Sequence, residues 1–229
     1  MNEQQQKNNS ASSECWVVEG LISCGKTTLL KTLASGDAVR ERFDEVILYP
    51  EPIKQRTLEI YLSNRADYAL SFQVITLMKR LHNVKDIRRL LEEKPRRLIL
   101  MDRGVLGDRA FETMQVNEGF FDALDHEYYL EEIGEFDGAL EKLLSDAMFR
   151  TFYLRCTPET AFRRLAKRGD PAEVAGYTLK YFEELYKAHE ATMADRPQIV
   201  RIDWEDDRVI ENSQLAAEDV RSFLEKIKF

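Results

Sequence analysis

Short apolar runs alternate with longer amphipathic stretches from residue 15 to the end of the chain. The short runs are rich in β-branched and aromatic residues and predict strands at 15–19, 45–49, 97–101, 149–154 and 198–202. The longer stretches repeat their apolar positions at helical spacing and predict helices at 27–35, 54–64, 67–93, 104–131, 136–146, 158–168, 177–194 and 213–227. This alternation predicts an α/β fold in which a five-stranded parallel sheet carries helices on both faces.

The chain is expected to form a single folded domain at residues 15–229. Its 229 residues suit one α/β unit with a sizeable core, and neither a repeat nor an interdomain linker is evident. Residues 1–14 are rich in Gln, Asn and Ser and lack apolar periodicity, so we expect a disordered tail there.

The net negative charge of the chain limits the classes of binding partner that we expect. Asp and Glu number 41 against 33 Lys and Arg, which gives a net charge of −8. A general nucleic-acid or anionic-membrane binder needs a basic surface, so neither class is expected, although a local basic pocket for a nucleotide fits this charge. No apolar run is long enough to span a membrane. Three scattered cysteines suit neither a disulfide framework nor a zinc site, and we expect a reducing, cytoplasmic location.

Residues 20–27 read Gly-Leu-Ile-Ser-Cys-Gly-Lys-Thr and fit the phosphate-loop pattern G-x-x-x-x-G-K-[ST]. A predicted strand precedes this segment and a predicted helix follows it, which a chance glycine turn would not require. Backbone N–H groups and the helix dipole would hold the phosphates of ATP, Lys26 would reach the β- and γ-phosphates, and the Thr27 hydroxyl would bind Mg²⁺. The residues expected to contact ATP here are Gly20, Leu21, Ile22, Ser23, Cys24, Gly25, Lys26, Thr27 and Thr28.

Charged side chains follow the second and third predicted strands, at the edge of a parallel sheet where ligands bind. Glu51 lies between Pro50 and Pro52, which stiffen the backbone around a carboxylate that could accept a proton from an attacking hydroxyl. Asp102 could lie near the Mg²⁺, as could Glu51, or act as a second base. Arg103 could hold the acceptor hydroxyl and the transferring phosphoryl group. The simpler alternatives are a solvated turn glutamate and a surface ion pair between Asp102 and Arg103.

The helix predicted at 158–168 places Arg164 and Arg168 four residues apart, and therefore on one face. A glycine then ends the helix, and a turn at Asp170-Pro171 follows. Arginines on such a helix-to-loop segment are typical of a lid that closes over phosphates. We expect both arginines to contact ATP and Arg168 to take part in catalysis, with a solvated basic face as the alternative.

Six segments in sequence order together match a known pattern, and they lie at residues 18–28, 51–52, 72–73, 102–104, 153–160 and 181–190. They resemble the motifs of the deoxyribonucleoside kinase family, which includes deoxycytidine and deoxyguanosine kinases. The resemblance extends over essentially the whole chain after residue 14. It implies a P-loop nucleoside-kinase fold with an arginine-bearing lid, and transfer of the γ-phosphate of ATP to the 5′-hydroxyl of a deoxyribonucleoside.

The resemblance also implies roles for individual residues. Glu51 corresponds to the catalytic base of the family. Phe72 and Gln73 resemble the pair that reads the base, with the glutamine making two hydrogen bonds to the base edge. Glu173 and Tyr61 are implied to hold the 3′-hydroxyl of the sugar.

The chain departs from the family pattern at several positions. Arg56 stands where a tryptophan usually lines the pocket, and Asp170 stands where a further lid arginine is frequent. Gly104 replaces the serine of the Asp-Arg-Ser motif, and Tyr61 is one residue further from Gln73 than the pattern expects.

Two other kinds of protein share the phosphate loop. A nucleoside monophosphate kinase, such as a thymidylate kinase, has a similar Asp-Arg motif but would lack the Glu-Pro and Phe-Gln pairs. A catalytically inactive nucleotide-binding subunit would bind ATP without turnover. A GTPase-like regulator should carry an Asn-Lys-x-Asp motif, and the sequence has none.

Arg80 follows Gln73 by seven residues on one predicted helix, and Asp108 follows Arg103 by five residues. An Arg80–Asp108 pair beside Gln73 would present donors and an acceptor to the base. In the resembled family such a pair marks kinases of deoxycytidine and purine deoxynucleosides, so we expect these substrates to be favoured over thymidine. A remote surface ion pair is the alternative.

We also expect a homodimer, by resemblance to the family. The predicted helices at 67–93 and 104–131 carry more apolar side chains than one sheet face needs, and plain core packing is the alternative. These side chains are Phe72, Leu77, Leu81, Phe111, Phe120, Phe121 and Leu124.

Overall fold

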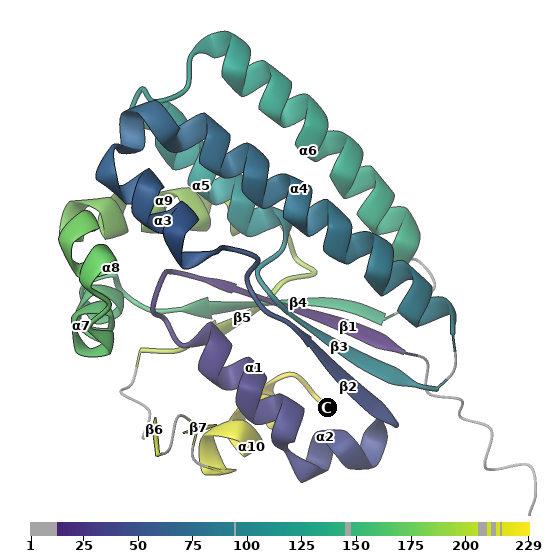
Figure 1. The fold of residues 1–229 in the computed structure, drawn as a ribbon. Helices are drawn as coiled ribbons and strands as arrows, with labels where there is room; N and C mark the ends of the chain where they lie inside the picture. Colours follow the sequence, from purple (N-terminus) through teal and green to yellow (C-terminus); the bar gives the residue numbers. More distant parts are fainter. Residues whose placement is uncertain (1–12, 94, 145–147, 206–209, 212–213, 216) are drawn as a thin grey trace, which may run out of the picture.

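The computed structural model describes residues 13–93, 95–144, 148–205, 210–211, 214–215 and 217–229, so nearly all of the tail predicted at 1–14 lies outside the described residues. A sheet of five parallel strands forms the centre, in the order β2-β3-β1-β4-β5 (Figure 1). The strands are β1 (Glu14–Gly20), β2 (Glu45–Tyr49), β3 (Arg97–Asp102), β4 (Met148–Arg155) and β5 (Val200–Asp203). The predicted fold class and strands are confirmed, with boundaries that differ by two residues at most.

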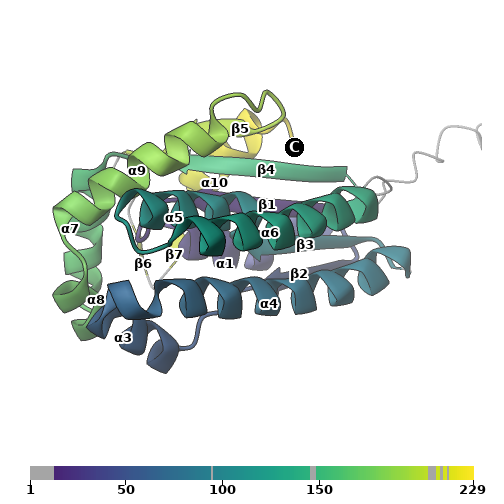
Figure 2. The same cartoon turned by 90° about the horizontal axis from the view of Figure 1, so that it is seen from above.

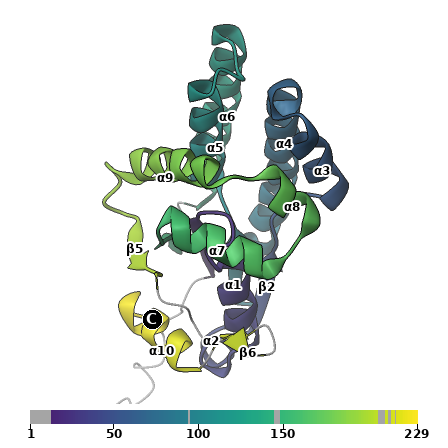
Figure 3. The same ribbon diagram turned by 90° about the vertical axis from the view of Figure 1, so that its left-hand side faces the viewer.

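Helices cover both faces of this sheet (Figures 1 and 2). One face carries α1 (Lys26–Ser35), α2 (Asp37–Arg42) and α10 (Ala217–Lys226), and the other carries α4 (Arg65–Glu92), α5 (Val105–Asn117) and α6 (Ala123–Leu144). Figure 3 looks onto the end of the sheet where α7 and α8 lie. The remaining bounds are α3 (Gln55–Ser63), α7 (Pro158–Arg168), α8 (Pro171–Gly176) and α9 (Leu179–Met193).

The two central strands explain why the sheet needs a cover on each face. Every residue of β1 and β3 is buried, and successive side chains point to opposite faces. Trp16 and Val18 of β1 join one core cluster, which also contains residues of α1 and α10. Cys15 and Val17 join the other cluster, with residues of α4 and α6.

The helix predicted at 104–131 is wrong in its boundaries. α5 ends at Asn117 and α6 begins at Ala123, and α6 continues to Leu144, so the separate helix predicted at 136–146 is its last part. Gly119 adopts a left-handed conformation with φ of 75°, which ends α5. The Asp122 carboxylate then accepts a hydrogen bond from the Asp125 amide in the first turn of α6. A glycine after the last turn and an aspartate before the first turn are ordinary signals for the end and the start of a helix.

The chain after β5 also differs from the expectation of one helix at 213–227. α10 begins only at Ala217, because β6 (Ile210–Glu211) and β7 (Gln214–Leu215) pair as a small antiparallel sheet. Two further helices, α2 and α8, were not predicted. Each has six residues, which is too short for an apolar period to be recognised.

Candidate active site

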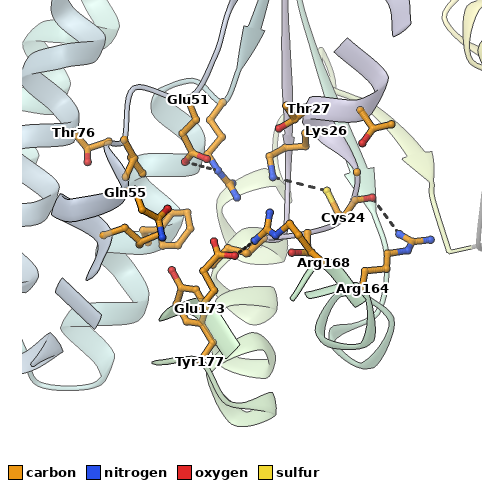
Figure 4. Close-up of a pocket in the computed structure, with 18 of the residues that line it drawn as sticks. Cys24, Lys26, Thr27, Glu51, Gln55, Thr76, Arg164, Arg168, Glu173 and Tyr177 are labelled. Carbon is orange, nitrogen blue, oxygen red and sulfur yellow. Dashed lines mark hydrogen bonds and ion pairs between the residues drawn. The ribbon is translucent and has the colours of Figure 1, made fainter. Parts of the chain in front are cut away.

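A cavity of about 760 Å³ lies between the phosphate loop and the α7–α8 segment (Figure 4). Most of the residues predicted to contact ligands line it together. They are Ile22, Ser23, Cys24, Gly25, Lys26, Thr27, Thr28, Glu51, Tyr61, Phe72, Gln73, Arg103, Asp108, Arg164, Arg168 and Glu173. Gly20, Leu21, Arg80 and Asp102 do not line the cavity and support residues that do.

The phosphate loop connects β1 to α1, as predicted. Gly20 and Gly25 have φ angles of 148° and 110°, which favour glycine, and an added Cβ at Gly20 would lie 2.6 Å from the Leu154 carbonyl oxygen. The Lys26 ammonium donates hydrogen bonds to the carbonyls of Leu21 at 2.8 Å and Gly20 at 3.3 Å. The first amides of α1 and the Lys26 charge therefore face the same loop, which suits a bound polyphosphate.

Thr27 and Asp102 form an oxygen-rich pair beside this loop. The Thr27 hydroxyl donates a hydrogen bond to Oδ2 of Asp102, and Oδ1 of this carboxylate is buried without a hydrogen-bond partner. Mg²⁺ prefers one or two such oxygen ligands together with substrate phosphates. Within the described residues, no group of three or more His, Cys, Asp or Glu side chains could hold a metal without such phosphates. The pair therefore fits Mg²⁺ carried in with ATP.

Glu51 and Arg103 form an ion pair at the ends of β2 and β3. The distance from Arg103 Nε to Glu51 Oε1 is 3.0 Å, and the Arg103 side chain is 1% exposed. The Glu51 side chain keeps 32% exposure and lines the cavity (Figure 4). Burial raises the pKa of Glu51, but the charges of Arg103, Lys26 and Arg80 and the hydrogen bond from Arg103 together lower it, so the net shift is downward. Because Arg103 is buried and pairs with Glu51, the alternative of a surface ion pair between Asp102 and Arg103 is wrong.

Arg103 is held from several further sides. Its Nη1 donates to the Gly20 carbonyl at 2.7 Å and lies 3.9 Å from Glu19 Oε2 and 3.5 Å from His189 Nε2. Its guanidinium also lies 5.0 Å from the centre of the Phe111 ring. Neither Glu19 nor His189 was among the predicted site residues. A carboxylate inside the apolar run of β1 was a signal for Glu19, whereas His189 gave none.

Aromatic and amide groups form the wall opposite the phosphate loop. The rings of Tyr61 and Phe72 stack with centres 4.3 Å apart and an angle of 16° between their planes. Gln73 is 2% exposed, and its Nε2 donates to the Asp108 carbonyl at 3.3 Å. This part of the cavity can hold a flat ring edge-on to polar groups.

Arg80 and Asp108 form a buried pair behind that wall. Arg80 Nε lies 2.6 Å from Asp108 Oδ2, and Nη2 donates to Oδ1 at 2.9 Å. The side chains are 2% and 3% exposed, so the alternative of a remote surface pair is wrong. The remaining nitrogen, Nη1, donates to the carbonyl of Arg103 at 2.7 Å. Arg80 thus connects Asp108, at the cavity, to the backbone of Arg103.

The α7–α8 segment has the helix caps that its sequence implies. Thr157 caps α7, whose last turn carries Lys167 and Arg168, and Gly169 ends it in a left-handed conformation. Asp170 caps α8, so this departure from the family pattern has a structural role.

The arginines of this segment make different contacts. Arg164 donates to the carbonyls of Cys24 and Trp204, both at 3.1 Å, and so connects α7 to the phosphate loop. Arg168, at the end of α7, pairs with Glu173 of α8 within the segment itself (Figure 4). The Asp170 carboxylate accepts a hydrogen bond of 3.1 Å from Gln55 of α3. The segment therefore bridges the phosphate loop and the opposite wall, as a lid would.

Several lining residues were not predicted from the sequence. Trp204 follows β5 directly, and reading the end of that strand in the same way as the others would have found it. Gln55 and Tyr177 reach the cavity from helix ends, where the sequence pattern carries no signal for a ligand site, whereas Lys167 lies on the predicted lid helix next to Arg168.

The sequence profile of the family described as Deoxynucleoside kinase matches residues 16–227. The chain belongs to the deoxynucleoside kinase family. It is accordingly an ATP-dependent deoxynucleoside kinase, which confirms the resemblance and decides against a nucleoside monophosphate kinase.

Individual relatives are distant. The chain is 25% identical over 217 residues to deoxycytidine kinase 2 of Gallus gallus, covering 82% of this chain and 76% of the relative. It is 26% identical over 220 residues to deoxyadenosine kinase of Dictyostelium discoideum, covering 93% and 80%.

Solved structures of deoxyadenosine kinase from M. mycoides have the same fold. The structure with bound dCTP has a TM-score of 0.68 at 19% identity and covers 93% of this chain and 98% of that one. The structure with bound dATP has a TM-score of 0.69 at 19% identity, covering 94% and 100%. Among the described residues of this kinase, no helix is long and apolar enough to cross a membrane.

Proposed function

We propose that this kinase transfers the γ-phosphoryl group of ATP to the 5′-hydroxyl of a deoxynucleoside, with Glu51 as the general base. The observation that carries this proposal is that Glu51, Arg103 and Lys26 share one cavity with Gln73 and Asp108. A nucleoside seated against the Gln73 wall would direct its sugar toward Glu51. The carboxylate would accept the hydroxyl proton as the oxygen attacks.

Positive charge around the phosphoryl group would stabilise the transition state. Lys26, the first amides of α1 and the lid arginines Arg164 and Arg168 supply this charge, and Arg103 orients the attacking oxygen. Thr27 and Asp102 would hold Mg²⁺, which neutralises phosphate charge when bound. Glu173 and Tyr61 both line the cavity and are proposed to hold the sugar 3′-hydroxyl.

The Arg80–Asp108 pair supports a preference for deoxyadenosine, deoxyguanosine or deoxycytidine over thymidine. The paired carboxylate and the Gln73 amide form a polar wall, whereas the 5-methyl group of thymine needs apolar room. A polar wall left unsatisfied by the wrong base costs about 1–3 kcal/mol, or roughly ten- to a hundredfold in kcat/KM. The two curated relatives are a deoxycytidine and a deoxyadenosine kinase, which agrees with this preference.

The direct test is a panel of the four deoxynucleosides and their 5′-monophosphates with ATP and Mg²⁺, comparing kcat/KM. We expect turnover of at least one purine deoxynucleoside or deoxycytidine, a lower value for thymidine, and no transfer to the monophosphates. Thymidine as the best substrate would contradict the base preference, and a monophosphate as the best acceptor would contradict the proposed reaction.

We further propose a homodimer formed through α4 and α6, which lie side by side on one face of the sheet (Figure 2). Of the seven apolar side chains named from the sequence of the two predicted helices, Phe72, Leu77 and Phe121 are buried in the core of their own chain. Only Leu124 among them is largely exposed. Other apolar side chains on these helices are exposed by 39% to 61%, namely Tyr68, Val74, Ile75, Met78 and Tyr128. A monomeric mass by light scattering at micromolar concentration would contradict the proposal.

A further inference from the structure

Glu19, near the end of β1, is a fully buried carboxylate that holds the start of α5. Its Oε1 accepts hydrogen bonds from the amides of Gly104 at 2.6 Å and Gly107 at 3.0 Å. The two glycines leave room for it, because an added Cβ at Gly107 would lie 2.5 Å from Glu19 Oε2. An added Cβ at Gly104 would lie 2.9 Å from Cγ1 of Val17. The carboxylate therefore joins the strand before the phosphate loop to the helix after Arg103.

The second oxygen of Glu19 faces Arg103. Oε2 makes no hydrogen bond, and it lies 3.9 Å from Arg103 Nη1. Burial raises the pKa of Glu19 to about 7, against the lowering effects of Arg103, of Arg80 and of the Gly104 and Gly107 amides. A protonated Oε2 would point its hydrogen at the donor groups of a guanidinium, so the ionised form fits this geometry.

His189 supports the same arginine from α9. Its Nδ1 lies 2.9 Å from the Leu185 carbonyl, which can only accept, so Nδ1 carries the hydrogen and Nε2 is free to accept from Arg103. Burial and then Arg103 lower the pKa of His189 to about 3, which keeps the ring neutral. The ring also stacks on Tyr153, with 6.1 Å between ring centres.

These supports matter because Arg103 has an unfavourable backbone conformation. Its φ of 67° lies in the left-handed region, which a non-glycine residue adopts only when its surroundings hold it there. Arg80 holds its carbonyl from α4, and Gly20 and Glu19 hold its guanidinium from β1.

We infer that Glu19 is a positioning residue for the kinase reaction: it fixes the Arg103 guanidinium beside Glu51 and keeps the start of α5 in register with the phosphate loop. This role rests on the proposed function of Arg103 at the acceptor hydroxyl. Glu19 does not line the cavity and acts only through Arg103 and the α5 amides.

The first test is Glu19→Gln, which keeps an oxygen for the two amides and removes the charge beneath Arg103. We expect kcat to fall about ten- to a hundredfold, while the Kd for ATP and the Tm stay close to the wild-type values. The matched control is Glu112→Gln, another buried carboxylate, which pairs with His126 away from the cavity. An unchanged kcat in Glu19→Gln, or a fall no larger than the loss of folded protein, would overturn the inference.

Gly107→Ala tests the placement of the Glu19 carboxylate without removing its charge, and it serves as a second variant in case Glu19→Gln does not fold. The new Cβ would displace the Glu19 carboxylate, while alanine itself favours the helix. We expect kcat to fall about tenfold or more. The control is Gly134→Ala on α6, where an added Cβ meets no atom within 4 Å. Full kcat in Gly107→Ala would overturn the inference.

Arg103→Lys separates this inference from the proposed function. If Arg103→Lys keeps its full kcat, the role proposed for Arg103 fails. If Arg103→Lys lowers kcat and Glu19→Gln does not, only the role of Glu19 fails. When both lower kcat, the double variant decides, because a residue that acts through Arg103 should cause little further loss once Arg103 is replaced. Equal losses from Glu19→Gln in both backgrounds would overturn the inference.

Discussion

The floor of the active site and its lid are built in different ways. The floor, formed by Arg80, Arg103 and Asp108, has side chains that are 1% to 3% exposed and joined by bonds from several elements. In the lid, α7 and α8, the Arg168 side chain is 47% exposed, and the hydrogen bond from Gln55 to Asp170 is open to solvent. Buried charged networks are costly to disturb, whereas exposed contacts are exchanged readily for water. We therefore expect the floor to fix the geometry of the reaction and the lid to open.

The largest effect is expected at Glu51, which pairs with Arg103 of the floor. Glu51→Gln should lower kcat by about 10² to 10⁴, the usual cost of losing a general base. ATP binding should remain, because Glu51 is proposed to act on the acceptor hydroxyl and not on the phosphates. Steady-state kinetics with a separate measurement of ATP affinity would check both parts. A wild-type kcat would transfer the role of base to Asp102 or remove it.

Lys26→Ala should lower turnover by about 10² to 10³ and weaken ATP binding at the same time. The lysine neutralises phosphate charge before and during the transfer, so both quantities should change together. Calorimetric ATP titration beside kcat would test this. Undiminished turnover would count against the phosphate-loop interpretation.

A double replacement deeper in the floor should change both selectivity and rate. Arg80→Met with Asp108→Ala opens apolar room beside Gln73, so the kcat/KM ratio of thymidine to the other deoxynucleosides should rise by about tenfold. The kcat for every substrate should also fall, because the Arg103 carbonyl loses its hydrogen bond from Arg80. A ratio unchanged across the four-nucleoside panel would show that this pair does not set base choice.

The smallest effects are expected in the lid. Asp170→Ala removes the cap of α8 and the contact to α3, which should raise the KM for the deoxynucleoside by about two- to tenfold. Gln55→Ala loses only the contact to α3 and serves as the matched comparison, with an expected change of about twofold. Losses as large as that of Glu51→Gln would remove the distinction between floor and lid.

The phosphate loop and Glu51 could be predicted because their signals, loop spacing and proline neighbours, are local. The Arg80–Asp108 pair spans 28 residues, and it was expected from the seven-residue interval between Gln73 and Arg80 together with the resemblance to the family. The α/β class follows from the alternation of strands and helices, and the P-loop nucleoside-kinase fold follows from the motifs that the chain shares with the family. A cytoplasmic location and the extent of the domain stay predictions.

The supports of Arg103 could not be predicted in this way. Glu19 meets Gly104 across 85 residues, and His189 meets Arg103 across 86, so only the folded chain brings them together. The same limit applies to apolar side chains on α4 and α5. Phe72 and Val74 are two residues apart, yet one is 8% and the other 39% exposed, and composition alone does not separate them.

The close approach at Gly104 has a consequence for how this family can vary. A Cβ at this position would lie 2.9 Å from Cγ1 of Val17, a branched side chain on a central strand that has little freedom to move. Chains with the usual serine of the Asp-Arg-Ser motif are therefore expected to carry a smaller residue than valine at the position of Val17. The residues at positions 17 and 104 should therefore change together during evolution, and a search for correlated substitutions across the family would reveal this.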